Sequence, residues 1–543
     1  MNIGRLFRTV RHLKPIQVAA RFWNKMPRRR PAESPLPARG VCPQTNGVCP
    51  QTAFPQYYPC WDGGTAFTFL HETHEVRTPT DWNNPAWPKL WLYNLHYFDC
   101  LRGTSHIRIS DEPRDSADGV AGLLVRWMAE NPVGQGNGWE PYPISLRVVN
   151  WIKWLVSGEA RTLPSDLRAR MERSLCVQVR YLRKRLEYHL LANHLLANAK
   201  ALVFAGTYFA GAEAEGWLRK GMTLYRRELP EQVLADGVHF ERGAMYHAII
   251  QEDLLDCFNL TGDAFFSPWI GRMRAGLALL TGPDGKLTKF NDAAEGIALP
   301  PEELQAYAER LGEAASRRFG KAPLGEAASR RFTGTTGVSP VAYRPVAASC
   351  DPPVGGECDP PVGGSGFVRM EAGAYVVLAK TGEIGPSYQP GHAHADTWTF
   401  ELWKDGAKAV TDTGCSTYVP GAVRSYERGT RAHNTVVVDG RDSSEVWASH
   451  RVGRRFDLAG HRRAFSLTEE GLSGVDEVGG RGVHDVEIRF HLVPGAAVEV
   501  SCAGERSEEP CEVAEGFGLR VPARCVVFRS RVTLPARFEW RVR

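Results

Sequence analysis

The densest group of side chains that could do chemistry is the run from Gly391 to Asp396, Gly-His-Ala-His-Ala-Asp. We predict that this run lies on a β-strand, where alternate residues share a face, so that His392, His394 and Asp396 point the same way. Imidazole and carboxylate groups gathered in this manner bind metal ions or transfer protons. A hydrogen-bonded polar surface is the competing interpretation for any one of these histidines.

Two later strands could bring further ligands to the same place. Asp412 follows the next predicted strand, and His433 opens the one after it. His394, Asp412 and His433 would form a ligand set of two nitrogens and one oxygen, which suits Zn²⁺. With a regular two-residue turn at Asp405-Gly406, Asp412 would face away from His394. The zinc site therefore requires a three-residue turn from Lys404 with a bulge at Gly406, or an equivalent irregularity near Asp412.

Two more polar clusters lie in segments that we predict to be helical. His189 and Asn193 are four residues apart and would share one face of a long helix, with His194 beside them. An Asn inside a helix is intrinsically unfavourable, so a polar cleft would explain it, and an Asn–His pair between packed helices is the competing interpretation. The segment from residue 236 to 249 predicts a turn followed by a helix that carries Tyr246. A tyrosine in such a position is ordinarily a core residue.

Hydrophobic periodicity divides the chain into four parts. Apolar residues recur at three- and four-residue spacing through about residues 61–310, which predicts a helical array or toroid. Residues 366–543 alternate apolar and polar positions and contain Asp-Gly turns, which predicts an antiparallel sheet or sandwich. Residues 311–365 hold two short duplications, LGEAASRRF and CDPPVGG, and we expect a flexible linker there. Residues 1–60 are a basic lead-in. The sequence ends within a predicted strand, so the sheet is either truncated or closed by a short edge strand.

The composition is that of an ordinary globular protein of 543 residues. Hydrophobic residues make up 43% and charged residues 23% of the chain, which excludes disorder of the whole. The net charge of +5 is too weak to indicate a nucleic-acid partner. No stretch approaches ~18 consecutive apolar residues, so we expect no transmembrane helix. The cysteines include no C-x-x-C pair, and we expect mostly reduced, buried thiols.

The first residues of the chain are basic and amphipathic. They lack the apolar core of about 7–15 residues and the small-residue cleavage site of a secretory signal, so we expect a cytoplasmic protein. The segment predicts a helix that docks on its own domain. A basic helix that lies on a membrane surface is the other interpretation.

Several of these segments together resemble the heparinase II/III-like family of polysaccharide lyases, including its alginate-lyase-type relatives. The segments are YHLLANHLLANAKAL, DGVHFERGAMYH, KFNDAAEG, GHAHADTWTFEL, AVTDTGCSTY and RAHNTVVVDG. WLYNLHYFD and GWEPYPISLRVVNWIKWL resemble relatives encoded with exopolysaccharide genes. The resemblance implies an incomplete α/α toroid followed by an antiparallel β-sandwich, which agrees with the order of helices and strands predicted above.

The resemblance also implies a reaction. Such lyases remove the C5 proton of a uronic acid and expel the sugar linked through O4, leaving an unsaturated product. Asn193 and His194 match the family's donors that neutralise the substrate carboxyl group. Tyr246 matches its catalytic tyrosine, an acid and, for syn elimination, also a base. His392 matches the histidine carried by the sandwich domain, a candidate base for the opposite epimer.

The predicted zinc ligands His394, Asp412 and His433 match a zinc site of mainly structural role in the family. The implied partner is an acidic polysaccharide. Because many relatives carry a secretory signal, the periplasm or cell envelope is the alternative location. Two other functions remain open: a non-catalytic protein that binds acidic glycans in exopolysaccharide metabolism, and a zinc-dependent hydrolase. The hydrolase is suggested by the H-x-H-x-D-H motif of metallo-β-lactamase-like enzymes, although Thr397 stands at the last position.

Overall fold

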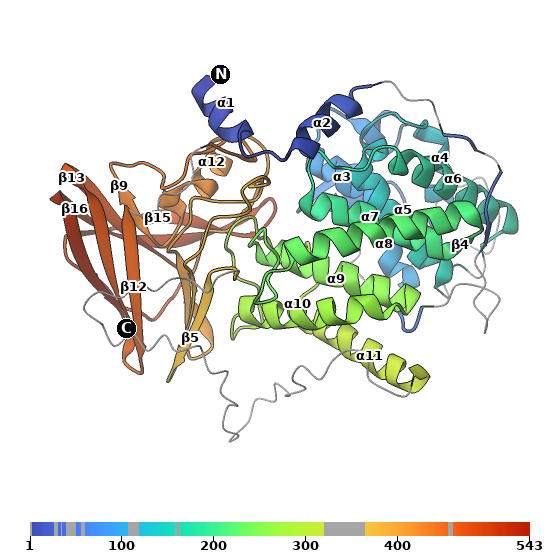
Figure 1. Ribbon diagram of the computed structural model, residues 1–543. Coiled ribbons are helices and arrows are strands. Elements are labelled where there is room, and N and C mark those ends of the chain that lie inside the picture. The colour runs from blue at the N-terminus through green and yellow to red at the C-terminus, as the bar shows by residue number, and fades with distance from the viewer. Residues whose placement is uncertain are drawn as a thin grey trace.

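The computed structural model describes residues 3–26, 31–33, 35–39, 50–55, 60–106, 119–157, 160, 163–319, 364–453 and 460–543. A helical domain and a sheet domain lie side by side, on the right and on the left of Figure 1. The helices are α1 Ile3–Val10, α2 Pro15–Asn24, α3 Lys89–Tyr97, α4 Val120–Glu130, α5 Pro141–Val156, α6 Ser165–Arg183, α7 Ala192–Tyr208, α8 Ala212–Gln232, α9 Ala244–Thr261, α10 Ser267–Leu280, α11 Pro301–Phe319 and α12 Ala422–Arg428. The strands are β1 Ala38–Arg39, β2 Ala66–Phe69, β3 Glu72–Glu75, β4 Phe209–Ala210, β5 Phe367–Ala372, β6 Tyr375–Lys380, β7 Phe400–Lys404, β8 Ala407–Val410, β9 Val436–Val438, β10 Val446–Trp447, β11 Arg451–Val452, β12 His461–Thr468, β13 Gly471–Leu492, β14 Val500–Cys502, β15 Glu505–Gly516 and β16 Leu519–Val542.

The helical domain is an incomplete α/α toroid packed around α7. This helix contacts α5, α8 and α9, and nearly all of its side chains are buried. A helix that is apolar on every face belongs in a core, and the Ala- and Leu-rich sequence of α7 has that character. Large rings fill the space around it, among them the fully buried Trp91 and Trp151.

The single long helix predicted around His189 is in fact two helices, α6 and α7. Leu191 and Ala192 between them have φ angles of 64° and 52°, a left-handed backbone that interrupts an α-helix. His189 lies in this connection, whereas Asn193 lies in the first turn of α7. The prediction that these two residues share a helix face was therefore wrong.

Hydrogen bonds from a side chain outweigh helix propensity in that connection. Asn198 accepts from the Glu187 N–H at 2.8 Å, and its Nδ2 donates to a carboxylate oxygen of Glu187 at 2.9 Å. The backbone carbonyl of Glu187 accepts from the N–H of Leu191 at 2.8 Å. These bonds stabilise a turn where the helix-forming residues alone favour a continuous helix.

The sheet domain is one ten-stranded antiparallel sheet that curls into a sandwich. Its strands follow the order β14-β16-β13-β8-β7-β6-β5, and β12, β15 and β9 pair with the long strands β13 and β16. A bulge between Val478 and Gly482 bends β13, so its first half pairs with β12 and its second half with β9. Phe400, Phe490 and Trp540 lie in the apolar core.

The last strand, β16, lies inside the sheet. It pairs with β13 along one side and with β14 and β15 along the other. Of the two alternatives, a short edge strand that closes the sheet was wrong, because alternation continues through 24 residues of β16.

The hairpin from β7 to β8 supplies the irregularity that the zinc hypothesis requires. Its turn has two residues, Asp405-Gly406, both with positive φ, and Lys404 pairs with Ala407 across it. The three-residue turn was therefore wrong. The pairing instead shifts by one residue at Ala409, two positions before Thr411 and close to Asp412.

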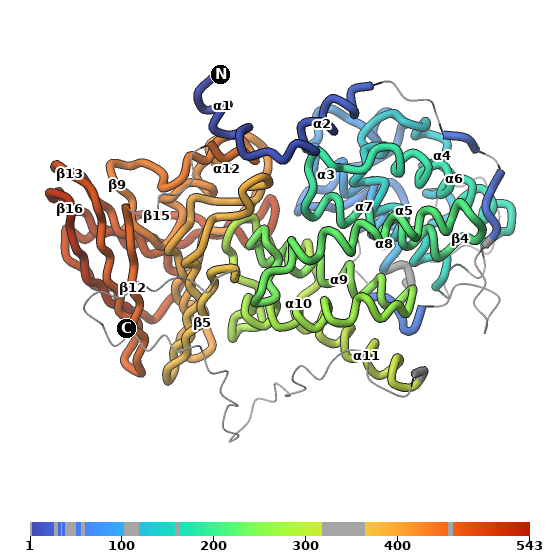
Figure 2. Tube along the Cα trace, in the orientation of Figure 1, coloured from blue at the N-terminus to red at the C-terminus, as the bar shows by residue number. Residues whose placement is uncertain are grey.

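The N-terminal helices lie outside both domains. Figure 2 traces α1 beside α12 of the sheet domain and α2 across the top of the helical domain. At the other end of the helical domain, α11 includes the first copy of LGEAASRRF, and residues 320–363 of the predicted linker lie outside the described residues. Within the described parts of the chain, no helix has the length and apolar character that crossing a membrane requires.

Candidate active site

The two domains meet at Tyr246 and His392. Tyr246 lies in the first turn of α9, and His392 lies in the connection between β6 and β7. Their ring centroids are 3.9 Å apart, with an interplanar angle of 31°. Each residue keeps only 8% of its surface exposed. A phenol from the helices and an imidazole from the sheet domain thus contact each other, and both are largely buried.

The segment that carries His392 and His394 is a loop, not the predicted β-strand. Its backbone groups are bonded to the end of α12. The Arg428 guanidinium donates to the Ala393 carbonyl at 2.9 and 3.1 Å, and the Arg428 carbonyl accepts from the Ala395 N–H at 2.9 Å. Buried backbone groups need partners. Here α12 supplies them, so the alternating pattern predicted the wrong element, although both histidines do converge.

They converge on Asp292, in the segment after α10. One carboxylate oxygen accepts from His392 Nδ1 at 2.8 Å, and the other accepts from His394 Nε2 at 2.8 Å. Arg424 of α12 pairs with both oxygens, at 2.8 Å for Nη2 and Oδ2. Burial alone would raise the pKa of Asp292, but the Arg424 guanidinium holds it well below its usual range. The carboxylate is therefore ionised.

Sequence reasoning assigned no role to Asp292. It lies within KFNDAAEG, one of the segments that carry the family resemblance, and this was the one signal that could have drawn attention to it. The spacing of residues gave no signal for Asp292, since its partner His392 is 100 residues away in the sequence.

The ionised carboxylate fixes which nitrogen of each ring is free. An ionised Asp only accepts, so His392 donates through Nδ1. Its Nε2 is the nitrogen that does not contact Asp292, and it lies 3.6 Å from a Glu241 oxygen. His394 donates through Nε2 and keeps its lone pair on Nδ1, a buried atom without a hydrogen-bond partner in the described chain. Burial lowers the pKa of His394 to about 4, so this imidazole is neutral.

Asn193 binds Glu241. Its Nδ2 donates to the two carboxylate oxygens at 2.9 and 3.2 Å, and its backbone N–H donates at 3.1 Å. Both residues are buried. The amide that the family resemblance assigns to the substrate carboxyl group is engaged with a carboxylate of the protein.

His194 is more accessible, with 24% of its side chain exposed. Its Nδ1 lies 3.1 Å from Glu187, and its ring centroid lies 4.6 Å from that of Tyr142. Burial alone would lower the pKa of His194, but the Glu187 carboxylate outweighs it and raises the pKa above its usual value. The raised pKa makes this imidazole easier to protonate than a free histidine.

Two further residues, absent from the predictions, lie beside the two rings at which the domains meet. Tyr418 Oη lies 2.9 Å from Tyr246 Oη, and the ring of His450 lies 5.0 Å from that of Tyr418. Burial, with a contribution from Asp292, raises the pKa of Tyr246 well above its usual value. The phenol therefore keeps its proton. Tyr418 belongs to AVTDTGCSTY of the resemblance, whereas no pattern pointed to His450.

The three predicted zinc ligands lie together, and all are fully buried. His433 Nδ1 is 2.8 Å from Asp412 Oδ2, and the ring centroids of His394 and His433 are 5.4 Å apart. His394 Nδ1 and His433 Nε2 are buried without hydrogen-bond partners among the described residues. Two such nitrogens near a carboxylate are ligand types that suit zinc, although their ligand atoms are not gathered as closely as those of the group described next. Burial alone would lower the pKa of His433 and raise that of Asp412. The Asp412 carboxylate instead raises the pKa of His433, and the His433 imidazole lowers the pKa of Asp412.

Among the described residues, the ligand atoms that all lie within 4.8 Å of one another belong to Asp292, His392 and His450, so this group could hold a metal ion. Arg424 already pairs with both oxygens of Asp292. Its positive charge opposes a divalent cation at the same carboxylate. This arrangement favours proton transfer by His392 over metal binding.

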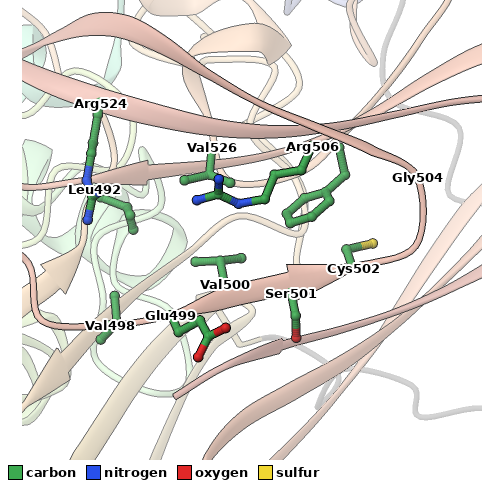
Figure 3. Close-up of a pocket in the computed structure, with 11 residues that line it drawn as sticks. Leu492, Val498, Glu499, Val500, Ser501, Cys502, Gly504, Arg506, Arg524 and Val526 are labelled. Atoms are coloured by element: carbon green, nitrogen blue, oxygen red, sulfur yellow. The ribbon is translucent and has the colours of Figure 1, made fainter.

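A separate hollow of about 430 Å³ lies in the sheet domain, between β14 and the strands β15 and β16 (Figure 3). Arg506, Arg524 and Glu499 line it together with apolar side chains. It contains none of the predicted site residues. The contact between Tyr246 and His392, rather than this hollow, therefore marks the candidate active site.

Comparison with known proteins identifies the fold and the family. The structure resembles that of heparinase III, with a TM-score of 0.60 and 16% identity over 97% of this chain and 89% of that one. It also resembles the heparan sulfate lyase HepC of Pedobacter heparinus, with a TM-score of 0.52 and 16% identity over 88% and 80% of the two chains.

Proteins related in sequence include two heparin-sulfate lyases. A heparin-sulfate lyase of Bacteroides thetaiotaomicron is 23% identical over 57% of this chain and 47% of its own length. One of Bacteroides stercoris is 25% identical over 48% and 37%. The chain thus spans less than half the length of the curated relatives it matches. Residues 120–295 match the heparinase II/III N-terminus and residues 355–460 the heparinase II/III-like C-terminal region, so the chain belongs to the heparinase II/III-like family.

Proposed function

We propose that this chain is a polysaccharide lyase that cleaves uronic-acid-containing polymers by β-elimination. The observation that carries the proposal is the 3.9 Å contact between the rings of Tyr246 and His392. Elimination needs a base at C5 and an acid at O4 of the same linkage. Two adjoining rings, one from each domain, supply both groups.

His392 is the proposed base. The C5 proton is weakly acidic because its removal places a second negative charge beside the carboxylate. Since Asp292 binds Nδ1 of His392, Nε2 is the nitrogen that is free to take the proton. The electron pair of the C5–H bond then forms the C4–C5 double bond as the C4–O4 bond breaks.

Tyr246 is the proposed acid. Its raised pKa keeps the phenol protonated, so it can give its proton to O4 as that oxygen leaves. The products of this step are a tyrosinate and an imidazolium whose rings adjoin. Return of the proton from His392 to Tyr246 restores both residues for the next turnover.

His194 is the proposed partner of the substrate carboxyl group. A cationic imidazole there would offset the charge that develops on the carboxylate during proton removal. Asn193 donates its amide to Glu241 in this structure. We propose that it takes part in neutralisation only by exchanging that partner for the substrate.

We also propose a zinc ion of structural role, held by His394 Nδ1, Asp412 and His433 Nε2. When bound, the ion would cross-link the loop before β7, the end of β8 and the residue that precedes β9. The hydrogen bond from His394 Nε2 to Asp292 supports this proposal, because a ligating histidine ordinarily donates its other nitrogen to a carboxylate.

A metal-dependent hydrolase is the second candidate function, on the single observation that Asp292, His392 and His450 could share an ion. The ion pair of Arg424 with Asp292 ranks it below the lyase. The two reactions leave different products, because hydrolysis adds water and creates no double bond.

The test is incubation of the full chain with heparan sulfate, alginate, glucuronan and bacterial exopolysaccharide. Ultraviolet absorbance of the conjugated double bond and new reducing ends are both measured. A lyase yields both signals and loses them in His392→Ala. Reducing ends without absorbance, abolished by a chelator, would establish the hydrolase. Binding of a polymer without either signal would leave a glycan-binding protein.

A further inference from the structure

The two N-terminal helices attach to the protein through polar side chains and turn apolar side chains outward. A surface helix of a globular protein normally does the reverse, because its apolar stripe packs on the core. Among the described residues, eight of the fourteen exposed large hydrophobic side chains lie between residues 3 and 26. The apolar surface is thus concentrated on this short segment.

Helix α1 docks by ion pairs. Arg5 and Arg8 each contact Glu445 of the sheet domain, with N–O distances of 2.9 and 2.7 Å. None of the residues of α1 is buried. At about 100° per residue, the opposite side of the helix carries an apolar stripe. Its side chains are 83%, 65% and 42% exposed: Ile3, Phe7 and Val10.

Helix α2 also docks through a polar side chain, which binds one carbonyl oxygen of each domain. Gln17 is fully buried, and its Nε2 donates to the carbonyl oxygens of Tyr388 and Leu190 at 3.2 and 3.4 Å. The opposite side of the helix and the residues just after it carry side chains that are 41–68% exposed: Ile16, Val18, Phe22, Trp23 and Met26.

The charge of this segment indicates which kind of surface would complement the apolar faces. Residues 3–26 contain six Lys and Arg residues and no Asp or Glu. Three of the six pair with carboxylates elsewhere in the protein: Arg5, Arg8 and Lys14. Arg11 and Lys25 are exposed beside the two apolar faces. An anionic bilayer complements both properties, because its interface accepts Phe and Trp rings while its phosphates pair with Arg and Lys. A second copy of this segment would instead oppose cations to cations.

We propose that α1 and α2 form an interfacial anchor that lays this protein on the surface of an anionic lipid bilayer. Helix α1 docks on the sheet domain, and α2 docks where the two domains meet, because Gln17 binds one carbonyl oxygen of each domain. The proposal is independent of the proposed lyase activity.

Sedimentation of the full chain with vesicles tests the anchor. We expect binding to mixed phosphatidylglycerol–phosphatidylcholine vesicles at least about tenfold stronger than to pure phosphatidylcholine vesicles, and weaker binding as salt rises. The double variant Phe22→Ser/Trp23→Ser and the double variant Arg11→Glu/Lys25→Glu should each lose about tenfold or more. The matched control is Val483→Ser, at a similarly exposed apolar side chain of the sheet domain, which should bind like the native chain.

Circular dichroism establishes that each variant is folded. The proposal is overturned if the native chain sediments with neither kind of vesicle, or if both double variants bind as well as it does. It is also overturned if the native chain forms a dimer that Phe22→Ser/Trp23→Ser abolishes while vesicle binding is absent, since a second copy would then cover the apolar faces.

Discussion

Two clusters of histidine and carboxylate side chains share Asp292 and differ in their access to solvent. His394, with Asp412 and His433, is completely buried, whereas His392 keeps 8% of its surface and lies near the exposed His450. The residue types are the same in both clusters. What separates them is the neighbour on the open side: the phenol of Tyr246 faces His392.

The comparison teaches that access, rather than residue type, distinguishes a histidine suited to transfer protons from one suited to hold a structure together. Asp292 joins the two clusters, because each of its oxygens orients one ring. Changes confined to one cluster should therefore affect either turnover or stability, and a change at Asp292 should affect both.

The largest effect is expected from Tyr246→Phe. Loss of the proposed acid should lower kcat by about 10²–10⁴-fold, while the cost in stability is only about 1 kcal/mol for the hydrogen bond to Tyr418. Steady-state kinetics and thermal unfolding measure the two quantities. Tyr418→Phe is the matched control, because it removes the same O–H···O contact and leaves the acid in place. Native turnover in Tyr246→Phe would remove this phenol from the mechanism.

His433→Ala should lower the stability of the fold and leave the proposed catalytic residues in place. It leaves Asp412 buried without its partner and removes a proposed zinc ligand, so we expect a loss of about 3–5 kcal/mol in the free energy of unfolding. Elemental analysis should show zinc in the native chain and not in the variant. His450→Ala, at an exposed position, is the control. A native chain without metal would leave only the ion pair between His433 and Asp412.

Asp292→Asn should affect both clusters, because Asp292 binds one histidine of each. An amide cannot accept from both rings and neutralise Arg424, so we expect a fall of about 10- to 100-fold in activity and in metal affinity. Nitrogen NMR should show that His392 loses its preference for a proton on Nδ1. Asp476→Asn is the matched control, because Asp476 is also buried between an Arg and a His. Equal effects of both variants on kcat would reduce Asp292 to a general structural role.

Glu187→Gln should have the smallest effect. Glu187 raises the pKa of His194, so the native KM should be low in acid and should rise as pH increases through that raised pKa. In the variant this rise moves to lower pH, with KM about two- to fivefold higher near neutrality and kcat little changed. The stability that the pair contributes is present below the ordinary pKa of histidine and is lost as pH rises through the raised one. Superimposable pH profiles of KM would exclude His194 from substrate binding.

Much of the fold was predictable from the sequence, because it depends on local patterns. The spacing of apolar residues predicted helices and then strands, and α9 carries Tyr246 as predicted. The Asp405-Gly406 turn is a regular two-residue hairpin, which residues that tolerate positive φ encode locally.

The arrangement of the site was less predictable, because it depends on contacts between distant segments. The alternating pattern around His392 predicts a strand. The segment is a loop because Arg428, distant in the sequence, binds its backbone. The sequence before α7 predicts a continuous helix. The chain turns there because Asn198 forms hydrogen bonds with Glu187.

The sequence by itself determined which groups are available: a helix-borne phenol, two histidines in one short run, and the residues that could bind zinc. Only the tertiary structure decided which nitrogen of His392 is free and that Tyr246 faces it. The physical reason is that tautomer and access are set by Asp292 and Arg424, which join the segment after α10 to α12 across more than a hundred residues of chain.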